Sequence, residues 1–392
     1  MDIKFTNEQE QYREKAKEWL KKNVPHDWKK KLSDYDELAK IQIDWDRKLY
    51  EGGFAGISWP KEYGGQGLTM VEEIIFNEEM RKAGAPDGIN AIGKGLLGPT
   101  LLALGTEEQK QRYIQPLLAT EEIWCQGYSE PNAGSDLASL KTQAVLDGDE
   151  WVINGQKVWT SYAQHAHWCF VLARTDINTP KHKGITYFLV PMNTEGITVK
   201  PIKQMNRKKK FSEVFFENVR IPKDSIVGEV NDGWNVAMKT LSFERGTVIL
   251  ARQAEFIKEY YDLIRLSEEL RISETGDNVL DNSYFRQKLA KAYMEFTILR
   301  YHGLNMISQI MNDGKLGPEA SIQKLFYSEA HQKFSELAME IQSHLATYWG
   351  ESGLAQGIFQ QIYLDTRGET IYAGTSQIQK NIIAERILGM PR

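Results

Sequence analysis

The sequence predicts an α+β protein of several domains: a helical N-terminal part, a β-barrel-like middle part and a helical C-terminal part. Two observations lead to this class. The chain has 392 residues, more than one hydrophobic core usually serves, so two or three domains are expected. The hydrophobic periodicity is helical over residues 1–122, strand-like over 123–232, and helical again over 233–392.

In the N-terminal part, apolar residues recur at helical intervals among charged ones. Thr69 with Glu72, and Thr106 with Gln109, have the spacing of capping boxes, which mark helix starts. The glycine-rich run 59–67 lacks the Lys-Ser or Lys-Thr of a phosphate-binding loop, so we interpret it as a structural turn. The predicted helices cover residues 8–22, 34–50 and 69–82, and a fourth opens at Thr106.

In the middle part, short apolar runs alternate with turn residues, which predicts a small barrel or sandwich. Residues 151–159 are interpreted as two strands joined by a turn at Asn154-Gly155. The basic run 207–210 is expected to be a solvated loop, and a docking patch for an acidic ligand or partner is the alternative. Further strands are predicted at 168–173, 186–191, 197–202 and 213–219.

In the C-terminal part, long helices are predicted over residues 234–266, 284–311 and 320–348, with a polar break at 273–283. Residues 371–379 form a turn into the last helix, which is expected to run to Leu388. Gly374 gives this turn a flexible backbone point, and Thr375 or Ser376 can cap the helix. A helix start offers free N–H groups to an anion or a polar ring edge, although a plain capped terminal helix explains the same residues.

Composition excludes several classes of protein. A net charge of −5 argues against a nucleic-acid-binding protein, and no apolar run reaches the length of a membrane span. The polar, acidic N-terminus does not resemble a signal or transit peptide. Cys125 and Cys169 are too few for a disulfide framework, so we expect both to be buried and the protein to be cytoplasmic. The seven histidines have no metal-ligand spacing, so no metal site is predicted.

Three separated stretches carry a family resemblance. Residues 128–136 (YSEPNAGSD) resemble the first signature of the acyl-CoA dehydrogenases, residues 154–161 (NGQKVWTS) the next block, and residues 371–379 (IYAGTSQIQ) the C-terminal one. Their order and spacing match, so the resemblance covers nearly the whole chain. It implies the acyl-CoA dehydrogenase fold, with a C-terminal four-helix bundle. It also implies FAD and the dehydrogenation of an acyl-CoA thioester to a trans-2-enoyl-CoA, as in the β-oxidation of fatty acids.

The resemblance assigns flavin contacts in the middle part. Gln126 and Ser129 would face the polar edge of the flavin, Trp159 would pack on its ring, and Ser161 would bond near the redox-active nitrogen. In isolation each of these residues has a structural explanation, since tryptophan is usually a core residue and serine is common in turns.

The resemblance also assigns contacts to two turns. Around Gly134 and Ser135, backbone N–H groups would approach ligand oxygens closely, and Ser135 would lie between the cofactor and the thioester arm of the substrate. Thr375 and Gln377 would contact the flavin from the last helix.

One departure concerns the catalytic base. Many family members have a catalytic glutamate where this chain has Ala373, which keeps only the backbone N–H that binds the developing enolate oxygen. Glu244 followed by Arg245 matches members of the isovaleryl-CoA type, which carry the base on the earlier helix. We therefore expect Glu244 to remove the α-proton and Arg245 to bind CoA or a nearby carboxylate. An exposed helical ion pair is the alternative, and Glu369 and Asp365 are further candidates for the base.

A second departure concerns assembly. The Arg-x-x-Phe-Gly and Gln-x-x-Gly-Gly-x-Gly stretches, with which family homotetramers complete the adenosine end of FAD, are missing here. In this respect the chain resembles heteromeric bacterial dehydrogenases of steroid side chains, and Arg286 is expected to replace the pyrophosphate ligand. We expect a homo-oligomer (tetramer or dimer) or a heteromer with a related subunit, and an electron-transferring flavoprotein as electron acceptor. An acyl-CoA or nitroalkane oxidase and a non-catalytic binding subunit are the alternatives.

Overall fold

The computed structural model describes residues 5–26, 28–31, 35–243, 249–272, 276–313 and 317–391. The chain forms two compact units. One consists of residues 12–76 and 83–244 and is called the sheet unit below. The other consists of residues 1–11, 77–82 and 245–392 and is called the bundle unit.

Helices make up the N-terminal part of the sheet unit, and the predicted ones are confirmed to within one residue. Their interior is aromatic: the rings of Trp19 and Trp45 lie 5.6 Å apart, and Phe54 stacks on Phe76 at 4.5 Å. The capping box of Thr106 is present. The helices are α1 (Asn7–Asn23) and α3 (Met70–Lys82), each of which has part of its length in the bundle unit, and α2 (Tyr35–Glu51), a π-helix (Gly93–Leu97), α4 (Gly98–Leu104), α5 (Glu107–Leu118) and, after the strands, α6 (Gly233–Phe243).

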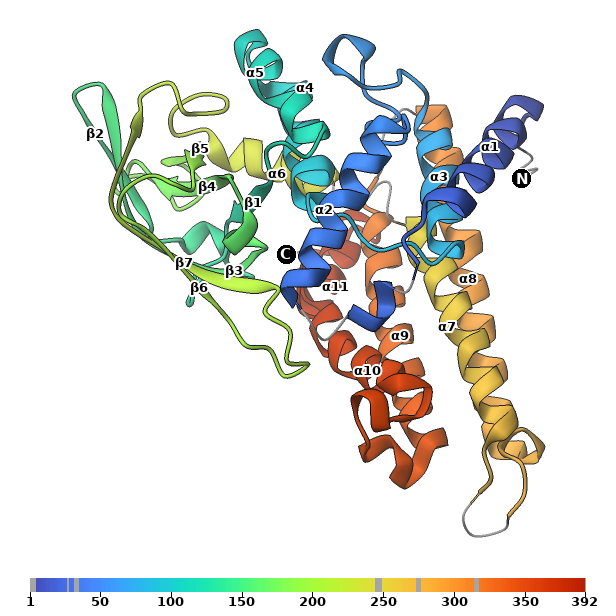
Figure 1. Cartoon of the computed structure of the whole chain (residues 1–392). Coiled ribbons are helices and arrows are strands. Elements are labelled where there is room, and N and C mark those ends of the chain that lie inside the picture. The colour runs from blue at the N-terminus through green and yellow to red at the C-terminus, as the bar shows by residue number, and fades with distance from the viewer. Residues whose placement is uncertain are drawn as a thin grey trace. The chain divides into compact units, whose positions relative to one another are not determined.

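A seven-stranded sheet follows, as predicted for the middle part, and its long strands curve visibly in Figure 1. The strand order is β1-β4-β2-β3-β7-β6, and β5 pairs with β4. Cys125 and Cys169 are buried free thiols opposite each other in β1 and β4, as expected of small core residues. The strands are β1 (Trp124–Gly127), β2 (Gln143–Asp147), β3 (Glu150–Ser161), β4 (Trp168–Arg174), β5 (Ile185–Pro191), β6 (Ile197–Pro201) and β7 (Phe211–Pro222).

The predicted turn at Asn154-Gly155 is wrong. These residues lie inside β3, which continues from Glu150 to Ser161, and the hairpin turn falls earlier, between β2 and β3. Gly155 sits at a register shift against β7 with φ of 152°, and a Cβ there would come 2.5 Å from Thr142 Oγ1. Glycine is therefore needed here for a β-bulge and for the close approach of Thr142. An Asn-Gly dipeptide suits such a bulge as well as it suits a tight turn.

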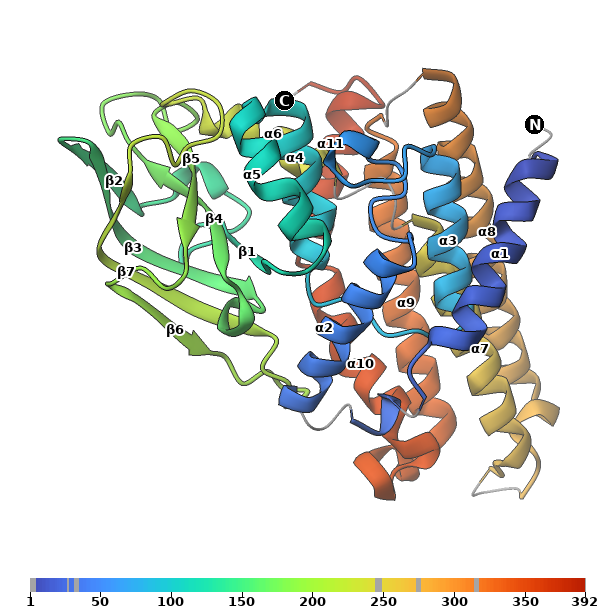
Figure 2. The same cartoon turned by 45° about the horizontal axis from the view of Figure 1, so that its top comes forward.

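The bundle unit contains long helices around one apolar core, which confirms the predicted four-helix bundle. Phe256, Phe296, Phe334 and Phe359 are completely or almost completely buried, and each comes from a different helix. In both Figure 1 and Figure 2, α7 and α8 lie side by side. The helices are α7 (Ile249–Glu269), α8 (Ser283–Asp313), α9 (Ala320–Gln342), α10 (Ile358–Glu369) and α11 (Ser376–Arg386).

Two helix predictions for this part need comment. The helix expected over 320–348 ends at Gln342, because Ser343 adopts a positive φ of 50° that an α-helix does not accept. Within the helix expected over 234–266, α6 ends at Phe243 and α7 begins at Ile249, and residues 244–248 lie outside the described ranges.

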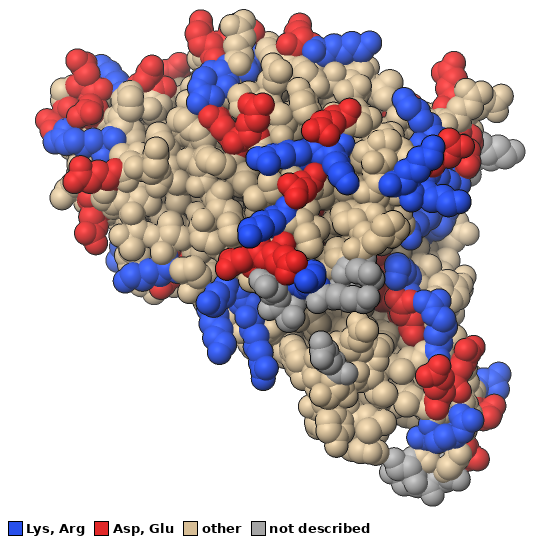
Figure 3. All heavy atoms as spheres, viewed as in Figure 1, with Lys and Arg blue, Asp and Glu red and all other residues tan. Residues whose placement is uncertain are grey.

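Membrane-spanning helices and metal-ligand groups are both absent from the described residues. None of the described helices combines the length and the apolar character needed to cross a bilayer. Within the same ranges, His, Cys, Asp and Glu form no group that could hold a metal ion. On the face drawn in Figure 3, acidic and basic side chains are mixed over most of the surface.

Candidate active site

In the sheet unit, strand β1 holds the first candidate flavin residue, Gln126. The start of this strand is fixed by the buried side chain of Asn90, whose Oδ1 accepts the Trp124 N–H at 2.9 Å. The same amide group donates to the carbonyls of Leu117 and Glu122, so β1 is fastened to the end of α5. The Nε2 atom of Gln126 is buried and has no hydrogen-bond partner among the described residues. An orphaned buried donor is costly, so this amide is suited to a ligand acceptor such as a flavin carbonyl.

The turn after β1 is tied to strand β3 by a buried ion pair. Lys157 is fully buried, and its Nζ lies 2.8 Å from Glu130 Oε1 and donates to the Tyr128 carbonyl at 3.1 Å. Glu130 also accepts the backbone N–H groups of Lys141 at 2.7 Å and Thr142 at 2.9 Å. One carboxylate thus joins three segments of chain. Sequence reasoning missed this pair, although two charged residues in the candidate flavin motifs were a usable signal.

Electrostatics favour the charged form of this carboxylate. Burial acts to raise the pKa of Glu130, but the Lys157 ammonium and the hydrogen bonds from Thr142 and Lys141 outweigh it and hold the pKa below its ordinary value. Complete burial lowers the pKa of Lys157, which Glu130 opposes. The attraction within the pair and its hydrogen bonds to three chain segments fix the turn.

This turn presents the other candidate residues of the sheet unit. The Ser129 carbonyl accepts the Val158 N–H at 2.9 Å, so the turn lies against β3. Gly134 and Ser135 are exposed, and a Cβ added to Gly134 would meet no atom within 4 Å, which leaves the backbone open to a ligand.

Trp159 projects from β3 beside this turn. Its indole is 58% exposed, in contrast to a core tryptophan, and its φ of 61° lies at a second register shift against β7. The ring meets only Phe211, edge to face at 6.0 Å, among the aromatic contacts of the described residues. Ser161, two residues further, is half-buried and pairs with Phe211 across the ladder. An exposed aromatic face on a rigid strand is suited to stacking with a planar ring.

In the bundle unit, the turn before α11 has the features of an anion-binding corner. Ala373 and Gly374 have positive φ values of 53° and 87°, and Gln379 Nε2 donates to the Ala373 carbonyl at 2.9 Å. Thr375 caps α11, as predicted, by accepting the Ile378 N–H at 3.2 Å. No described residue accepts the N–H of Ala373. This N–H is therefore available to a ligand oxygen.

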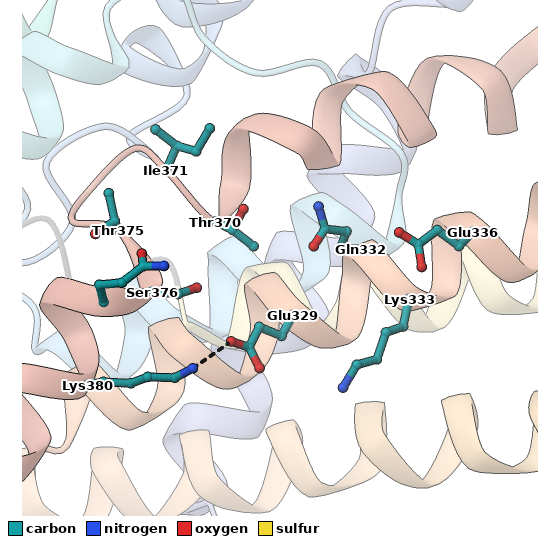
Figure 4. A pocket seen from close by; sticks show the side chains of 10 residues that line it. Glu329, Gln332, Lys333, Glu336, Thr370, Ile371, Thr375, Ser376 and Lys380 are labelled. Carbon is teal, nitrogen blue, oxygen red and sulfur yellow. Dashed lines mark ion pairs between the residues drawn. The ribbon is translucent and has the colours of Figure 1, made fainter.

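A polar pocket of about 510 Å³ adjoins this turn (Figure 4). Ser376 is only 8% exposed, and its Oγ atom has no partner among the described residues. Lys380 pairs with Glu329 at 3.9 Å across the pocket. The pocket is lined by residues of α9, the turn and α11: Glu329, Gln332, Lys333, Glu336, Thr370, Ile371, Thr375, Ser376, Gln377 and Lys380. Its spare donors at a helix start fit a polar, anionic group, such as part of FAD.

The remaining candidates differ in what the structure says of them. Glu244 and Arg245 lie outside the described residues. Arg286 is exposed on the first turn of α8 and has no side-chain partner in the described part of the chain. Glu369 is buried, with Oε2 3.0 Å from His331 Nδ1, whereas Asp365 is exposed and accepts a hydrogen bond from Gln361.

Comparison with known proteins covers nearly the whole chain. Residues 6–121, 125–219 and 231–388 match the family descriptions of the acyl-CoA dehydrogenase N-terminal, middle and C-terminal domains. The acyl-CoA dehydrogenase IpdE1 of Mycobacterium tuberculosis is 39% identical over 395 residues, which cover 98% of each chain.

Two solved structures have the same architecture. The ChsE4-ChsE5 complex of Mycobacterium tuberculosis contains a chain that is 29% identical, with a TM-score of 0.88 and complete coverage of both chains. The Tcur3481-Tcur3483 steroid ACAD is 30% identical, also with a TM-score of 0.88 and complete coverage. Both are similar to this chain throughout its helical, β and helical parts.

Proposed function

The chain belongs to the acyl-CoA dehydrogenase family, an oxidoreductase family of flavoproteins, and from this premise we propose that it oxidises an acyl-CoA thioester to its trans-2-enoyl-CoA. The observation that carries the proposal is the uncommitted N–H of Ala373, which sits in a fixed turn at the start of α11. The three domain matches indicate the class of reaction. The turn provides a backbone N–H that can bind the oxygen on which negative charge develops.

The Ala373 N–H is proposed to bind the thioester carbonyl oxygen. Negative charge develops on that oxygen when the α-proton leaves, so a donor that is already in place lowers the barrier. The left-handed backbone at Ala373 and Gly374 is held by Gln379, which bonds both carbonyls, at 2.9 Å and 3.3 Å. The donor therefore does not need to reorganise during the reaction.

Glu244 is proposed to remove the α-proton, and Arg245 to bind the CoA part of the substrate. The alternatives near the signature are poorly suited. Glu369 is occupied by His331, and Asp365 is exposed to water rather than desolvated. Ala373 itself has no acid.

FAD is the proposed cofactor, and when bound it supplies the acceptor for the hydride that leaves the β-carbon. Gln126 would donate to its polar edge, and Trp159 would stack on its ring. The remaining polar contacts are proposed to come from Ser129, Gly134, Ser135, Ser161, Arg286, Thr375 and Gln377.

The substrate and partners are proposed from the relatives. One similar structure is described as a steroid ACAD and another as a complex of two different chains, so we propose a bulky acyl group and a heteromer with a related subunit. The side chain of Arg286, which is exposed and has no partner among the described residues, agrees with completion of the site by another chain. A homotetramer is the alternative assembly. An electron-transferring flavoprotein is the proposed electron acceptor and the cytoplasm the proposed location.

An anaerobic titration with a panel of acyl-CoAs tests the proposal. The flavin absorbance of the purified protein is expected to bleach with a good substrate, and the Glu244→Gln variant is expected to retain FAD without bleaching. Flavin reduction at a near-normal rate in this variant would exclude Glu244 as the base. Absence of bleaching with every acyl-CoA would favour the non-catalytic subunit, and rapid reoxidation by oxygen would favour the oxidase.

A further inference from the structure

Three helices of the bundle unit enclose a cluster of charged side chains that the reaction scheme above does not use. His331 on α9 lies between two carboxylates: Nδ1 is 3.0 Å from Glu369 Oε2, and Nε2 is 2.8 Å from Glu259 Oε2. All three side chains are at most 14% exposed. Phe256 stacks on the imidazole at 3.9 Å and shields it from water. The histidine thus links α7 to the end of α10.

The geometry favours a doubly protonated ring. Each ring nitrogen faces a carboxylate oxygen, and a hydrogen on both nitrogens lets the ring donate to both carboxylates. Burial opposes the positive charge, but Glu259 and Glu369 outweigh it and raise the pKa of His331 to about 10. Burial also raises the pKa of Glu259, an effect that His331 opposes.

The imidazolium offsets negative charge in the cluster. Arg252 lies 3.9 Å from Glu369 and 3.8 Å from Glu255, both beyond hydrogen-bond distance. With His331 protonated, its charge and that of Arg252 face the carboxylates of Glu255, Glu259 and Glu369, and loss of that proton removes one of these positive charges. The charged and titratable groups around the cluster are Arg252, Glu255 and Glu259 of α7, Lys324 and Tyr327 of α9, Asp365 and Glu369 of α10, and Tyr372 of the turn.

The cluster also adjoins the turn before α11, residues 370–375. Glu369 is the last residue of α10, four residues before Ala373, and Lys324 Nζ donates to its backbone carbonyl at 2.8 Å. The turn then folds back on this helix end, since the Ser376 N–H donates to the Thr370 carbonyl at 3.0 Å. None of these bonds uses the Ala373 N–H.

We propose that His331 is a positioning residue, whose imidazolium holds Glu369 and thereby sets the direction of the Ala373 N–H. This inference rests on the proposed function, because it assigns that N–H to the thioester oxygen. No bond forms or breaks at His331 during the reaction. Its proton stays in place as a fixed charge, and it acts on the substrate only through the turn.

The test compares His331→Gln and Glu369→Gln with a matched control, Ser335→Ala. Ser335 is buried one helical turn further along α9 and bonds to Thr366 of α10 at 2.9 Å, so it has the same kind of interhelical contact. Two quantities are measured: amide hydrogen exchange in the peptide that spans residues 370–380, and the rate constant of flavin reduction with its dependence on acyl-CoA concentration.

The His331 and Glu369 variants are expected to exchange the turn amides faster and to reduce flavin about tenfold more slowly, because a misdirected oxyanion donor loses transition-state stabilisation. The apparent affinity for acyl-CoA should change less than about twofold, since a donor that acts in the transition state affects mainly the rate. Ser335→Ala should leave both readouts unchanged. A folded His331→Gln protein with wild-type exchange and wild-type reduction would overturn the proposal.

The pH dependence separates a charge effect from simple packing. Because folding raises the pKa of His331, its contribution is complete below the unfolded value and is lost as the pH rises through about 10. In the wild type, the protection of the turn amides against hydrogen exchange should therefore fall in that pH range. The fall should occur at lower pH in Glu259→Gln and should be absent in His331→Gln. An identical alkaline limb in all three proteins would contradict the proposal. If the wild type fails to reduce flavin, the proposed function is wrong, but hydrogen exchange still tests the role of His331.

Discussion

The polar groups in and around the proposed flavin site are of two kinds: those that have hydrogen-bond partners within the chain and those that do not. Lys157 and Glu130, which support the site, have several partners each within the chain. Gln126 Nε2 and the Ala373 N–H, which would touch ligands, have none among the described residues. Groups whose hydrogen bonds are satisfied within the chain stabilise the fold, whereas buried groups without a partner are available to a ligand. Substitutions at these two kinds of residue should therefore have opposite effects on stability.

Gln126→Leu is expected to leave the FAD-free protein as stable as the wild type or more stable by about 1 kcal/mol, because it removes a buried donor without a partner. FAD affinity should fall about tenfold, as for one lost hydrogen bond. Denaturant unfolding of the apoprotein and titration with FAD measure the two effects.

Gln360→Leu is the matched control. Its Nε2 bonds to Gln342 at 3.2 Å inside the bundle unit, so the substitution should cost stability without changing FAD affinity. If Gln126→Leu bound FAD normally, Gln126 would not be a flavin ligand.

Lys157→Met is expected to destabilise the protein by about 3–5 kcal/mol, because it leaves Glu130 buried without its cation. The double variant Glu130→Gln/Lys157→Met should recover part of this loss, since no buried charge remains. Arg220→Met, which breaks exposed pairs with Asp147 and Glu150, should cost much less, because solvent screens both pairs. Urea unfolding compares the three, and equal costs at Lys157 and Arg220 would refute the structural role of the buried pair.

The carboxylate of Glu130 should also make the stability of the protein depend on pH in the acidic range. Folding lowers the pKa of Glu130, so its stabilising contribution is present above the unfolded pKa and is lost as the pH falls through the folded value. Stability should therefore decrease on acidification, and less steeply in Glu130→Gln. Thermal unfolding at a series of acidic pH values measures the slope, and parallel curves would contradict the assignment.

Among the elements, helix starts were predictable and strand interruptions were not. A capping residue acts over three or four positions, so Thr69, Thr106 and Thr375 marked their helices correctly from local sequence. The Asn154-Gly155 dipeptide was misread because a bulge and a hairpin turn accept the same residues, and only the partner strand β7 decides between them. Strands β1 and β2 were not among the predicted strands.

Two of the threonine caps, Thr106 and Thr375, offer a comparison between stability and binding. Thr375→Ala and Thr106→Ala should each cost about 1 kcal/mol, since each side chain accepts one N–H at a helix start. Only Thr375→Ala should weaken FAD binding, because α5 has no proposed ligand. Paired unfolding and FAD titrations measure both, and equal FAD affinity in the two variants would exclude Thr375 from the site.

At the scale of the whole molecule, the three-part architecture followed from hydrophobic period alone, whereas the site did not. The flavin residues came from the family resemblance, because single serines and tryptophans have no pattern that separates a ligand contact from a turn or core role. The cluster around His331 was not predicted, since its members are spread over residues 252–369 and meet only when the bundle forms.

Assembly can be tested on the intact protein. Expressed alone, the 45.0 kDa chain is expected to retain less than one FAD per chain, because the stretches that complete the adenosine end in homotetramers are missing. Co-expression with a related subunit should raise this ratio. Light scattering after size exclusion, combined with flavin absorbance, measures mass and loading together. A homotetramer of this chain with one FAD per chain would refute the heteromer.

The exposed indole of Trp159 has a spectroscopic consequence. Trp159 is the only exposed tryptophan in the described ranges, so its emission should lie at the longest wavelengths of the intrinsic tryptophan fluorescence. A flavin stacked on that indole would quench this component first, while the buried tryptophans would dim only through energy transfer over distance. Cofactor loading could therefore be followed in real time, without substrate and without a label, from the colour of the protein's own emission.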